Sequence, residues 1–138
     1  MFIWKSEFEL GIKSIDDQHK KLLEIGNKIG DLVEASSDSI DNFDEIMEVL
    51  GELKDYTEYH FETEEILFAE YGYEGADDHK IEHDAFVDYL NAVNFDEVDE
   101  NQKIFLQELL NKIIQWVFKH IISTDFLYKD FLLAKGVK

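Results

Sequence analysis

The chain of 138 residues has the size of one domain, and its lack of proline and low number of glycines, seven, favour an all-α fold. Its formal net charge of -19 argues against nucleic acids and anionic membranes as partners, because both are negatively charged themselves. The absence of cysteine excludes disulfides, zinc–thiolate sites and iron–sulfur clusters, so any bound metal must take nitrogen and oxygen ligands.

The first residues carry charges where a signal peptide has its apolar run, and no segment is long and apolar enough to cross a bilayer. We therefore expect a soluble, cytoplasmic protein. Residues 1–14 are predicted to form an arm that packs on the domain through its aromatic residues Phe2, Trp4 and Phe8.

Four segments then show apolar residues at steps of three and four, the periodicity of amphipathic helices. In chain order they cover residues 16–35, 42–71, 77–93 and 100–122. Asp77 or Asp78 is the predicted cap of the third helix, a turn is expected over residues 36–39, and the polar stretch 94–99 is expected to be a loop.

Helices joined by short connections predict an up-down-up-down four-helix bundle over residues 15–122. A short C-terminal helix and tail over residues 123–138 follow it. No repeat, low-complexity tract or second domain is visible, so residues 1–138 are predicted to form a single domain.

Five histidines and Glu64 lie on the inward-facing stripes of these helices, where unpaired polar groups are normally excluded, and Asp125 follows directly after the fourth helix. They stand at the start of the first helix, the end of the second, the start of the third and the end of the fourth. Because these four places coincide at one end of an antiparallel bundle, the sequence predicts a buried metal centre there. The candidate ligands are His19, His60, Glu64, His79, His83, His120 and Asp125.

Two pairs of candidate ligands are four residues apart and therefore share one face of a helix. These pairs are His60 with Glu64 and His79 with His83. His120 and Asp125 are five apart, which turns them roughly 140° from each other on a regular helix. We therefore expect the fourth helix to end between them, at a cap formed by residues 123 and 124.

The residue types among these seven candidate ligands limit which metal the site would bind. Seven ligands exceed the four that one zinc ion takes, and five imidazoles disfavour calcium and magnesium, which prefer oxygen. Two carboxylates among imidazoles suit a bridged pair of first-row metals, with iron or manganese as the natural choices. No histidine follows a glutamate at the third position, which argues against the ferritin-like di-iron class.

The order of these seven residues resembles the hemerythrin family, specifically its single-domain bacterial members. Residues 15–20, Ile-Asp-Asp-Gln-His-Lys, are similar to the family's first ligand segment, and residues 60–65, His-Phe-Glu-Thr-Glu-Glu, to its second. Trp4 stands where the N-terminal arm of the family carries an aromatic residue. The resemblance covers nearly the whole chain, and no ligand position is missing.

The resemblance implies a non-haem centre of two iron ions. One iron would be bound by His79, His83 and His120, and the other by His19 and His60. Glu64 and Asp125 would bridge the two ions together with an oxo or hydroxo group derived from solvent. This leaves one position open, on the iron with two histidines, and dioxygen would bind there reversibly.

A dry pocket would surround this open position, with Phe61, Ile113, Trp116 and Val117 as its candidate walls. Nitric oxide or small anions such as azide and chloride would compete for the same position. The implied protein is an oxygen binder for storage, delivery or scavenging rather than an enzyme, and a monomer or weak homo-oligomer. Sensing is disfavoured because the chain shows no partner domain.

Two other functions remain open at this point. The same centre would serve a di-iron oxidase, peroxidase or nitric-oxide-handling enzyme, although the sequence shows no nucleophile, cofactor loop or redox cysteine. A structural metal site in an interaction module is the third hypothesis, and an open coordination position argues against it. Tyr128, close to Asp125 in sequence, either supports the centre or serves packing.

Overall fold

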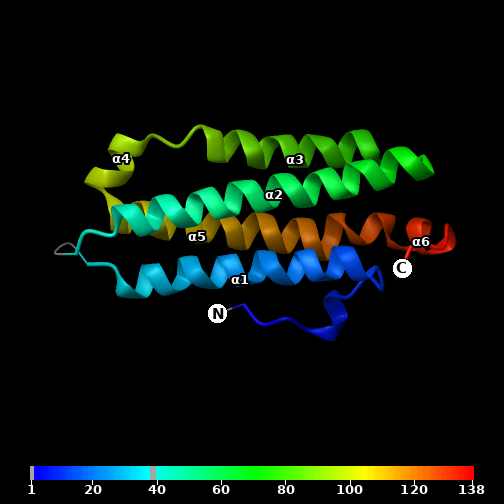
Figure 1. Ribbon diagram of the computed structural model, residues 1–138, viewed down its shortest axis with the longest axis horizontal. Helices are drawn as coiled ribbons and strands as arrows, with labels where there is room; N and C mark the ends of the chain where they lie inside the picture. Colours follow the sequence, from blue (N-terminus) through cyan, green and yellow to red (C-terminus); the bar gives the residue numbers. More distant parts are fainter. Residues whose placement is uncertain (1, 38–39) are drawn as a thin grey trace.

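The computed structural model describes residues 2–37 and 40–138 and is built around four long helices. These are α1 (Lys13–Ala35), α2 (Phe43–Tyr71), α3 (Ala76–Asn91) and α5 (Gln102–Lys119). Successive long helices run in opposite directions along one axis (Figure 1). α1 packs against α2 and α5, and α2 packs against α3. The predicted all-α bundle is confirmed.

The turn between α1 and α2 and the end of α2 can be compared with the sequence prediction. Of the predicted turn, Asp38 and Ser39 lie outside the described residues. α2 ends at Gly72, whose φ of 71° is the left-handed conformation that glycine adopts readily. Among the described residues, no helix has the length and apolar character needed to cross a membrane.

The predicted cap of the third helix was wrong. Gly75 occupies the N-cap position, and its neighbours Asp77 and Asp78 lie in the first turn of α3. Carboxylates in a first turn are favoured by the helix dipole, so these aspartates stabilise the helix start without capping it. The earlier start places His79 within the first turns of α3, facing the bundle interior with 2% exposure.

A short helix, α4 (Phe95–Glu100), replaces the polar loop predicted over residues 94–99, so that prediction was wrong as well. The Asn94 side chain accepts hydrogen bonds from the backbone N–H groups of Asp96 and Glu97, at 3.0 and 3.2 Å. Asparagine and aspartate favour turns and helix caps alike, so composition alone did not distinguish the two. Val98 buries the inner face of this helical turn.

The N-terminal arm is tied to α1 at both of its ends. A 3₁₀ turn, η1 (Ser6–Phe8), leads to Gly11, which has a φ of 84°. The buried carboxylate of Asp16 accepts hydrogen bonds from the N–H groups of Leu10 at 2.8 Å and Gly11 at 3.1 Å. The arm thereby enters α1 at a fixed angle.

At the other end of the arm, the Asn27 side chain bonds both backbone groups of Phe2, at 2.7 and 2.9 Å. The Phe2 ring lies over Gly26, where a Cβ would approach it to 2.5 Å. A side chain at Gly26 would therefore displace this ring, and the glycine allows the arm to lie close to α1.

We expect Asp16→Ala to destabilise the fold by about 1–3 kcal/mol, because it leaves two backbone donors of the arm junction without their charged acceptor. Thermal unfolding of the variant measures this loss. Asp17→Ala is the matched control, since Asp17 is exposed and pairs with Lys13 at the surface. Equal melting temperatures for the two variants would contradict a structural role for Asp16.

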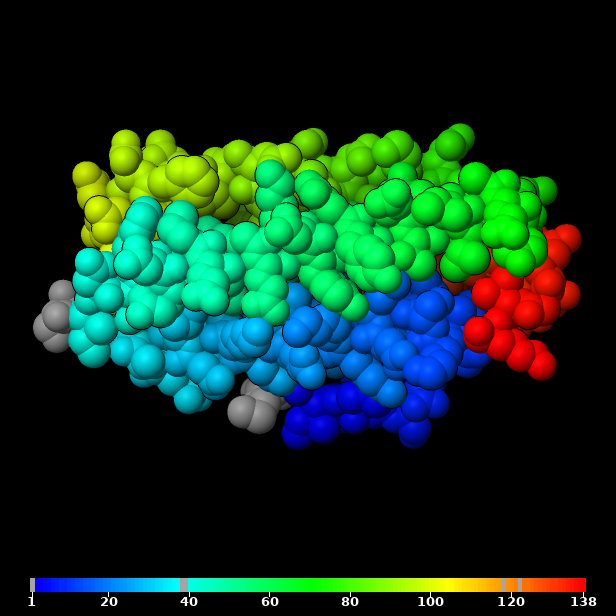
Figure 2. All heavy atoms as spheres, viewed as in Figure 1, coloured from blue at the N-terminus to red at the C-terminus, as the bar shows by residue number. Residues whose placement is uncertain are grey.

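The apolar side chains form two clusters. The larger cluster fills the body of the bundle and includes Ile29, Leu53 and Leu109. The smaller one joins the arm to the last helix, α6 (Phe126–Ala134), through Leu10, Ile15, Phe68, Tyr128 and Leu132. The space-filling view shows α6, in red, at the end of the bundle where α1 begins (Figure 2). This second cluster therefore closes the end at which the predicted ligands lie.

Candidate metal centre

All seven predicted ligands converge inside the closed end of the bundle. His19 comes from the start of α1, His60 and Glu64 from α2, and His79 and His83 from the start of α3. His120 and Asp125 come from the chain segment that follows α5. Each of the seven side chains is at most 2% exposed. The structure thus brings together every residue that the sequence singled out.

The seven side chains form two groups, and within each group the candidate ligand atoms lie within 4.8 Å of one another. One group has three histidines and a glutamate, and the other has two histidines and an aspartate. The members are Glu64, His79, His83 and His120 in the first group, and His19, His60 and Asp125 in the second. Three histidines on one side and two on the other is the division that the family resemblance implies.

Asp125 spans the two groups with its two oxygen atoms. Its Oδ2 lies 2.7 Å from His19 Nε2, while its Oδ1 lies 2.9 Å from both His79 Nε2 and His120 Nε2. A carboxylate with one oxygen toward each group has the position of a bridging ligand between two metal ions.

Glu64 also contacts both groups, although less symmetrically. Its Oε1 lies 2.9 Å from His60 Nε2 and 3.3 Å from His83 Nε2, and its Oε2 lies 3.3 Å from His79 Nε2. Both carboxylates therefore lie between the histidines of the two groups.

His120 and Asp125 meet through a widened helical turn. Residues His120–Thr124 form a π-helical segment, η2, and the Asp125 N–H donates to the His120 carbonyl at 2.7 Å. This i to i+5 bond lets five residues take the place of four, which brings Asp125 back to the face of His120. The predicted helix end and cap were therefore wrong. The Thr124 hydroxyl instead donates to Glu82 Oε1, at 3.2 Å.

The charges of the centre are strongly coupled. Burial lowers the pKa of His60 and His120, but Glu64 and Asp125 outweigh it and raise these values to about 9 and about 10. Burial dominates for His19, and its pKa falls below the ordinary value. The neighbouring imidazoles outweigh the burial of both carboxylates and hold their pKa values well below the usual range. The carboxylates thus stay ionised and favour positive charge in the centre.

The arrangement of the candidate ligand atoms suits metal coordination better than hydrogen bonding among the side chains themselves. The Nε2 atoms of His19, His60 and His79 and the oxygens of both carboxylates are buried without an aligned hydrogen bond among the described residues, despite their short separations. Buried polar atoms without a partner are costly unless a metal binds them. His83 Nε2 and His120 Nε2 face each other at 3.2 Å, near the roughly 3 Å between adjacent ligands on an octahedral ion with bonds of about 2.1 Å.

Comparison with known proteins decides the family. A family model described as the hemerythrin HHE cation binding domain matches residues 10–132. The chain belongs to the hemerythrin family. Its relatives include a bacteriohemerythrin of Clostridium acetobutylicum, 42% identical over 94% of this chain and 100% of the relative. A bacteriohemerythrin of Pseudomonas aeruginosa is 33% identical over 93% of this chain and 79% of the relative.

Solved hemerythrin structures share the fold. A crystal structure of wild-type hemerythrin superposes with a TM-score of 0.75 at 27% identity, covering 94% of this chain and 96% of that one. A crystal structure of a hemerythrin with a single leucine-to-alanine substitution superposes equally well, also with a TM-score of 0.75. The family and the shared fold support oxygen binding at a di-iron centre in this chain.

Two candidate ligand histidines of this hemerythrin have hydrogen-bond partners on their outer ring nitrogens. His60 Nδ1 donates to Gln18 Oε1 at 2.7 Å, and His83 Nδ1 donates to Glu65 Oε2 at 3.1 Å. Such bonds hold each ring in the tautomer whose Nε2 is free for a metal. The sequence prediction missed both partners, although Gln18 adjoins His19 and Glu65 adjoins Glu64.

The four predicted pocket residues all pack in the larger cluster, but only two of them have described ring contacts with the ligands. The Phe61 ring stacks on His83 with centroids 3.9 Å apart, and the half-buried Trp116 stacks on His120 at 4.3 Å. Ile113 and Val117 are buried, with exposures of 1% and 3%. The side chains on this side of the centre are thus apolar and closely packed.

Tyr128 closes the opposite side of the centre. Its ring lies against Phe68 and His79, with centroids 5.1 and 5.5 Å away, and it is fully buried. Burial, reinforced by the charges of Asp125 and Glu64, raises the pKa of its hydroxyl well above the ordinary value. Tyr128 therefore stays neutral and separates the carboxylates from solvent.

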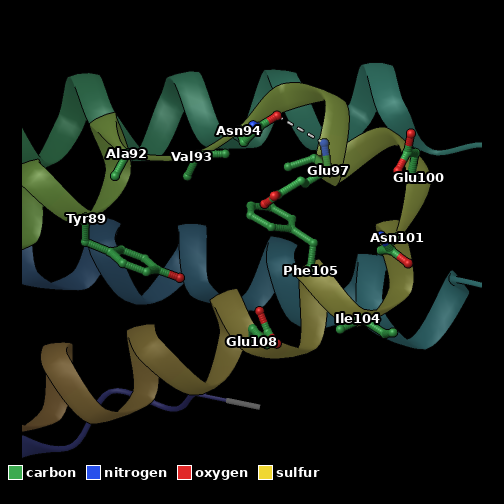
Figure 3. A pocket seen from close by; sticks show the side chains of 11 residues that line it. Tyr89, Ala92, Val93, Asn94, Glu97, Glu100, Asn101, Ile104, Phe105 and Glu108 are labelled. Atoms are coloured by element: carbon green, nitrogen blue, oxygen red, sulfur yellow. Dashed lines mark hydrogen bonds between the residues drawn. The ribbon is translucent and has the colours of Figure 1, made fainter.

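One surface cleft lies far from this centre. A cleft of about 560 Å³ opens between the end of α3, α4 and α5, where Tyr89, Phe105 and Glu108 line it (Figure 3). No histidine lines this cleft. It lies at the opposite end of the bundle from the ligands and forms no part of the metal centre.

Proposed function

We propose that this chain binds dioxygen reversibly at two iron ions held by the seven converging residues. His79, His83 and His120 would hold one ion and His19 and His60 the other, and both carboxylates would bridge them together with an oxo or hydroxo group. The observation that carries the proposal is the unequal division of the histidines, with Asp125 contacting both groups. Such unequal ligation would leave an open position on the ion with two histidines.

The protein's part in this function is to hold and shield the pair. A reduced di-iron pair supplies the electrons that reversible oxygen binding needs. The ionised carboxylates offset the charge of the two ions, and the neutral imidazoles complete their coordination. Closely packed apolar side chains around the centre would limit the access of water, and thus of protons, to the pair. Phe61 and Trp116 stack on His83 and His120 of the half with three histidines.

We place the physiological role in oxygen storage, delivery or scavenging. Nitric oxide, azide and chloride are small enough to occupy the same open position, so we propose them as competing ligands. We propose that the centre binds oxygen rather than turning over a substrate.

The test is the optical spectrum of iron-loaded, anaerobically reduced protein, recorded before oxygen, after oxygen and after argon sparging. A charge-transfer band that appears with oxygen and disappears under argon, with two irons per chain by elemental analysis, is the expected result. A band that decays irreversibly, with continued oxygen consumption in the presence of a reductant, would assign the centre to an oxidase instead. No band at all would indicate a structural metal site.

A further inference from the structure

The two halves of the centre differ in the charge of their outer hydrogen-bond partners. On the half with three histidines, His83 donates to the carboxylate of Glu65. On the half with two histidines, His60 donates to the neutral amide of Gln18. Neither His19 nor His120 has a partner on Nδ1 among the described residues. A ring of the half with three histidines thus has a negatively charged hydrogen-bond acceptor, whereas the acceptor on the other half is neutral.

Glu65 is held in place from the surface. Its Oε1 lies 3.4 Å from Lys80 Nζ, while its Oε2 accepts from His83 at 3.1 Å. The side chain is 33% exposed and lies in a surface groove between α2 and α3 that also reaches Phe61 and His83. Lys80 and His83 thus hold the two carboxylate oxygens in a fixed orientation toward the centre.

Gln18 is held equally firmly from the other side. It is 5% exposed, and its amide nitrogen donates to the Thr63 hydroxyl at 3.2 Å. This bond directs the amide oxygen at His60. The ring of His60 therefore has an acceptor that orients it without adding charge.

A carboxylate that accepts from a ligand imidazole draws the ring proton toward itself and makes the ring a stronger donor to the metal. A stronger donor stabilises the higher oxidation state of the ion. An amide acceptor orients the ring in the same way but lacks the charge. The ion bound by His83 is therefore the easier of the two to oxidise.

We propose that Glu65 is a positioning residue that directs one-electron oxidation to the iron bound by His79, His83 and His120, while Gln18 keeps the iron with the open position ferrous. This proposal rests on the di-iron centre proposed above. When one equivalent of ferricyanide takes one electron from the reduced pair and becomes ferrocyanide, the electron leaves the half with three histidines. The iron of the half proposed to bind dioxygen stays ferrous.

The test uses two charge-exchange variants of the iron-loaded protein, Glu65→Gln and Gln18→Glu. Glu62→Gln is the matched control, because Glu62 lies in the same groove and is exposed without a described contact to a ligand. Reduction potentials are measured by spectroelectrochemical titration, and the ferric site of the one-electron-oxidised form is identified by Mössbauer spectroscopy. Iron retention against a chelator is measured in parallel.

We expect Glu65→Gln to raise the first potential and to weaken iron retention by about 10- to 100-fold, the usual effect of losing such a partner. Gln18→Glu should lower the reduction potential of the half with two histidines, so that the potentials of the two iron sites become more similar. Glu62→Gln matches wild type. Potentials in both exchange variants equal to those of Glu62→Gln would overturn the proposal. So would a wild-type ferric ion on the half with two histidines.

The outcomes separate this proposal from the proposed function. Reversible oxygen binding with potentials that do not respond to Glu65 or Gln18 would overturn only the role of these residues. Potentials that respond as expected, in a protein whose oxygen band is irreversible, would support that role and overturn reversible binding. If Glu65→Gln does not fold, the potential of Gln18→Glu decides alone, since the two variants act on different ligands.

Discussion

His60→Ala reduces the iron content from two ions per chain to one or fewer and abolishes the oxygen-dependent band. The affected half has only two histidines, and His19 alone remains beside the carboxylates after the substitution. The other half keeps its three imidazoles and retains the ion it holds. Because the proposed oxygen position lies on the depleted half, we expect oxygen binding to be lost even where one iron stays.

Elemental analysis after loading and desalting measures this effect. Asp55→Ala is the control, because Asp55 lies on the outer face of the same helix and is exposed. It should keep two irons and a reversible band. Two irons per chain in His60→Ala would contradict the assignment of this histidine, and with it the division of the ligands into two groups.

The position of the centre could be predicted from the sequence because two periodicities agreed. The helical period placed His19, His60, His79, His83 and His120 on inner faces, and the alternating direction of the helices placed them at one end. The structure has both features: each of these histidines is at most 2% exposed, and successive long helices run in opposite directions. Because the connections between successive helices are short, neighbouring helices are expected to be antiparallel.

The join between His120 and Asp125 could not be predicted in the same way. A spacing of five residues is compatible with a helix that breaks and with a helix that widens. Ser123 and Thr124 are acceptable in either case. The choice depends on tertiary packing, since α6 must bring Tyr128 and Leu132 into the second cluster while Asp125 points at the ligands. A π-turn satisfies both demands without interrupting the backbone hydrogen bonds.

The outer partners were missed for another reason. Gln18 and Glu65 each adjoin a ligand in sequence, but a neighbour along a helix points about 100° away from it. Gln18 contacts His60 of another helix, and Glu65 contacts His83 of another helix. Only the packing of α1 on α2 and of α2 on α3 brings these pairs together, so no single-helix pattern contains them.

Metal-free and iron-loaded protein should respond differently to rising pH. In the metal-free protein, the pKa of His60 is raised from 6.5 to about 9 and that of His120 to about 10. The folded protein thus holds these protons at pH values where the unfolded chain has lost them. The resulting stabilisation is complete below about pH 6.5 and is lost as the pH rises through 9 and 10.

The remaining groups act in other pH windows. The lowered pKa values of Glu64 and Asp125 stabilise the fold above the ordinary carboxyl values of 4.5 and 3.8, and this contribution is lost in acid. The lowered pKa of His19 adds stability as the pH rises toward 6.5 and nothing further above it. Metal-free protein is therefore most stable slightly below neutral pH and loses on the order of a few kcal/mol toward pH 9.

Iron removes this loss of stability at alkaline pH, because the metal takes the place of the protons on the imidazole rings. A ligand imidazole must be neutral, so acid competes with iron while alkali does not. Iron-loaded protein should keep its iron and its melting temperature from neutral pH to about 9 and release iron below about pH 6. Calorimetric melting of loaded and chelator-treated samples across this range measures both slopes. A metal-free melting temperature that rises from pH 6.5 to 9 would show that His60 and His120 are not charged in the folded protein. The carboxylates would then have no imidazolium partners, and the acidic centre would need another account of how it stays buried without metal.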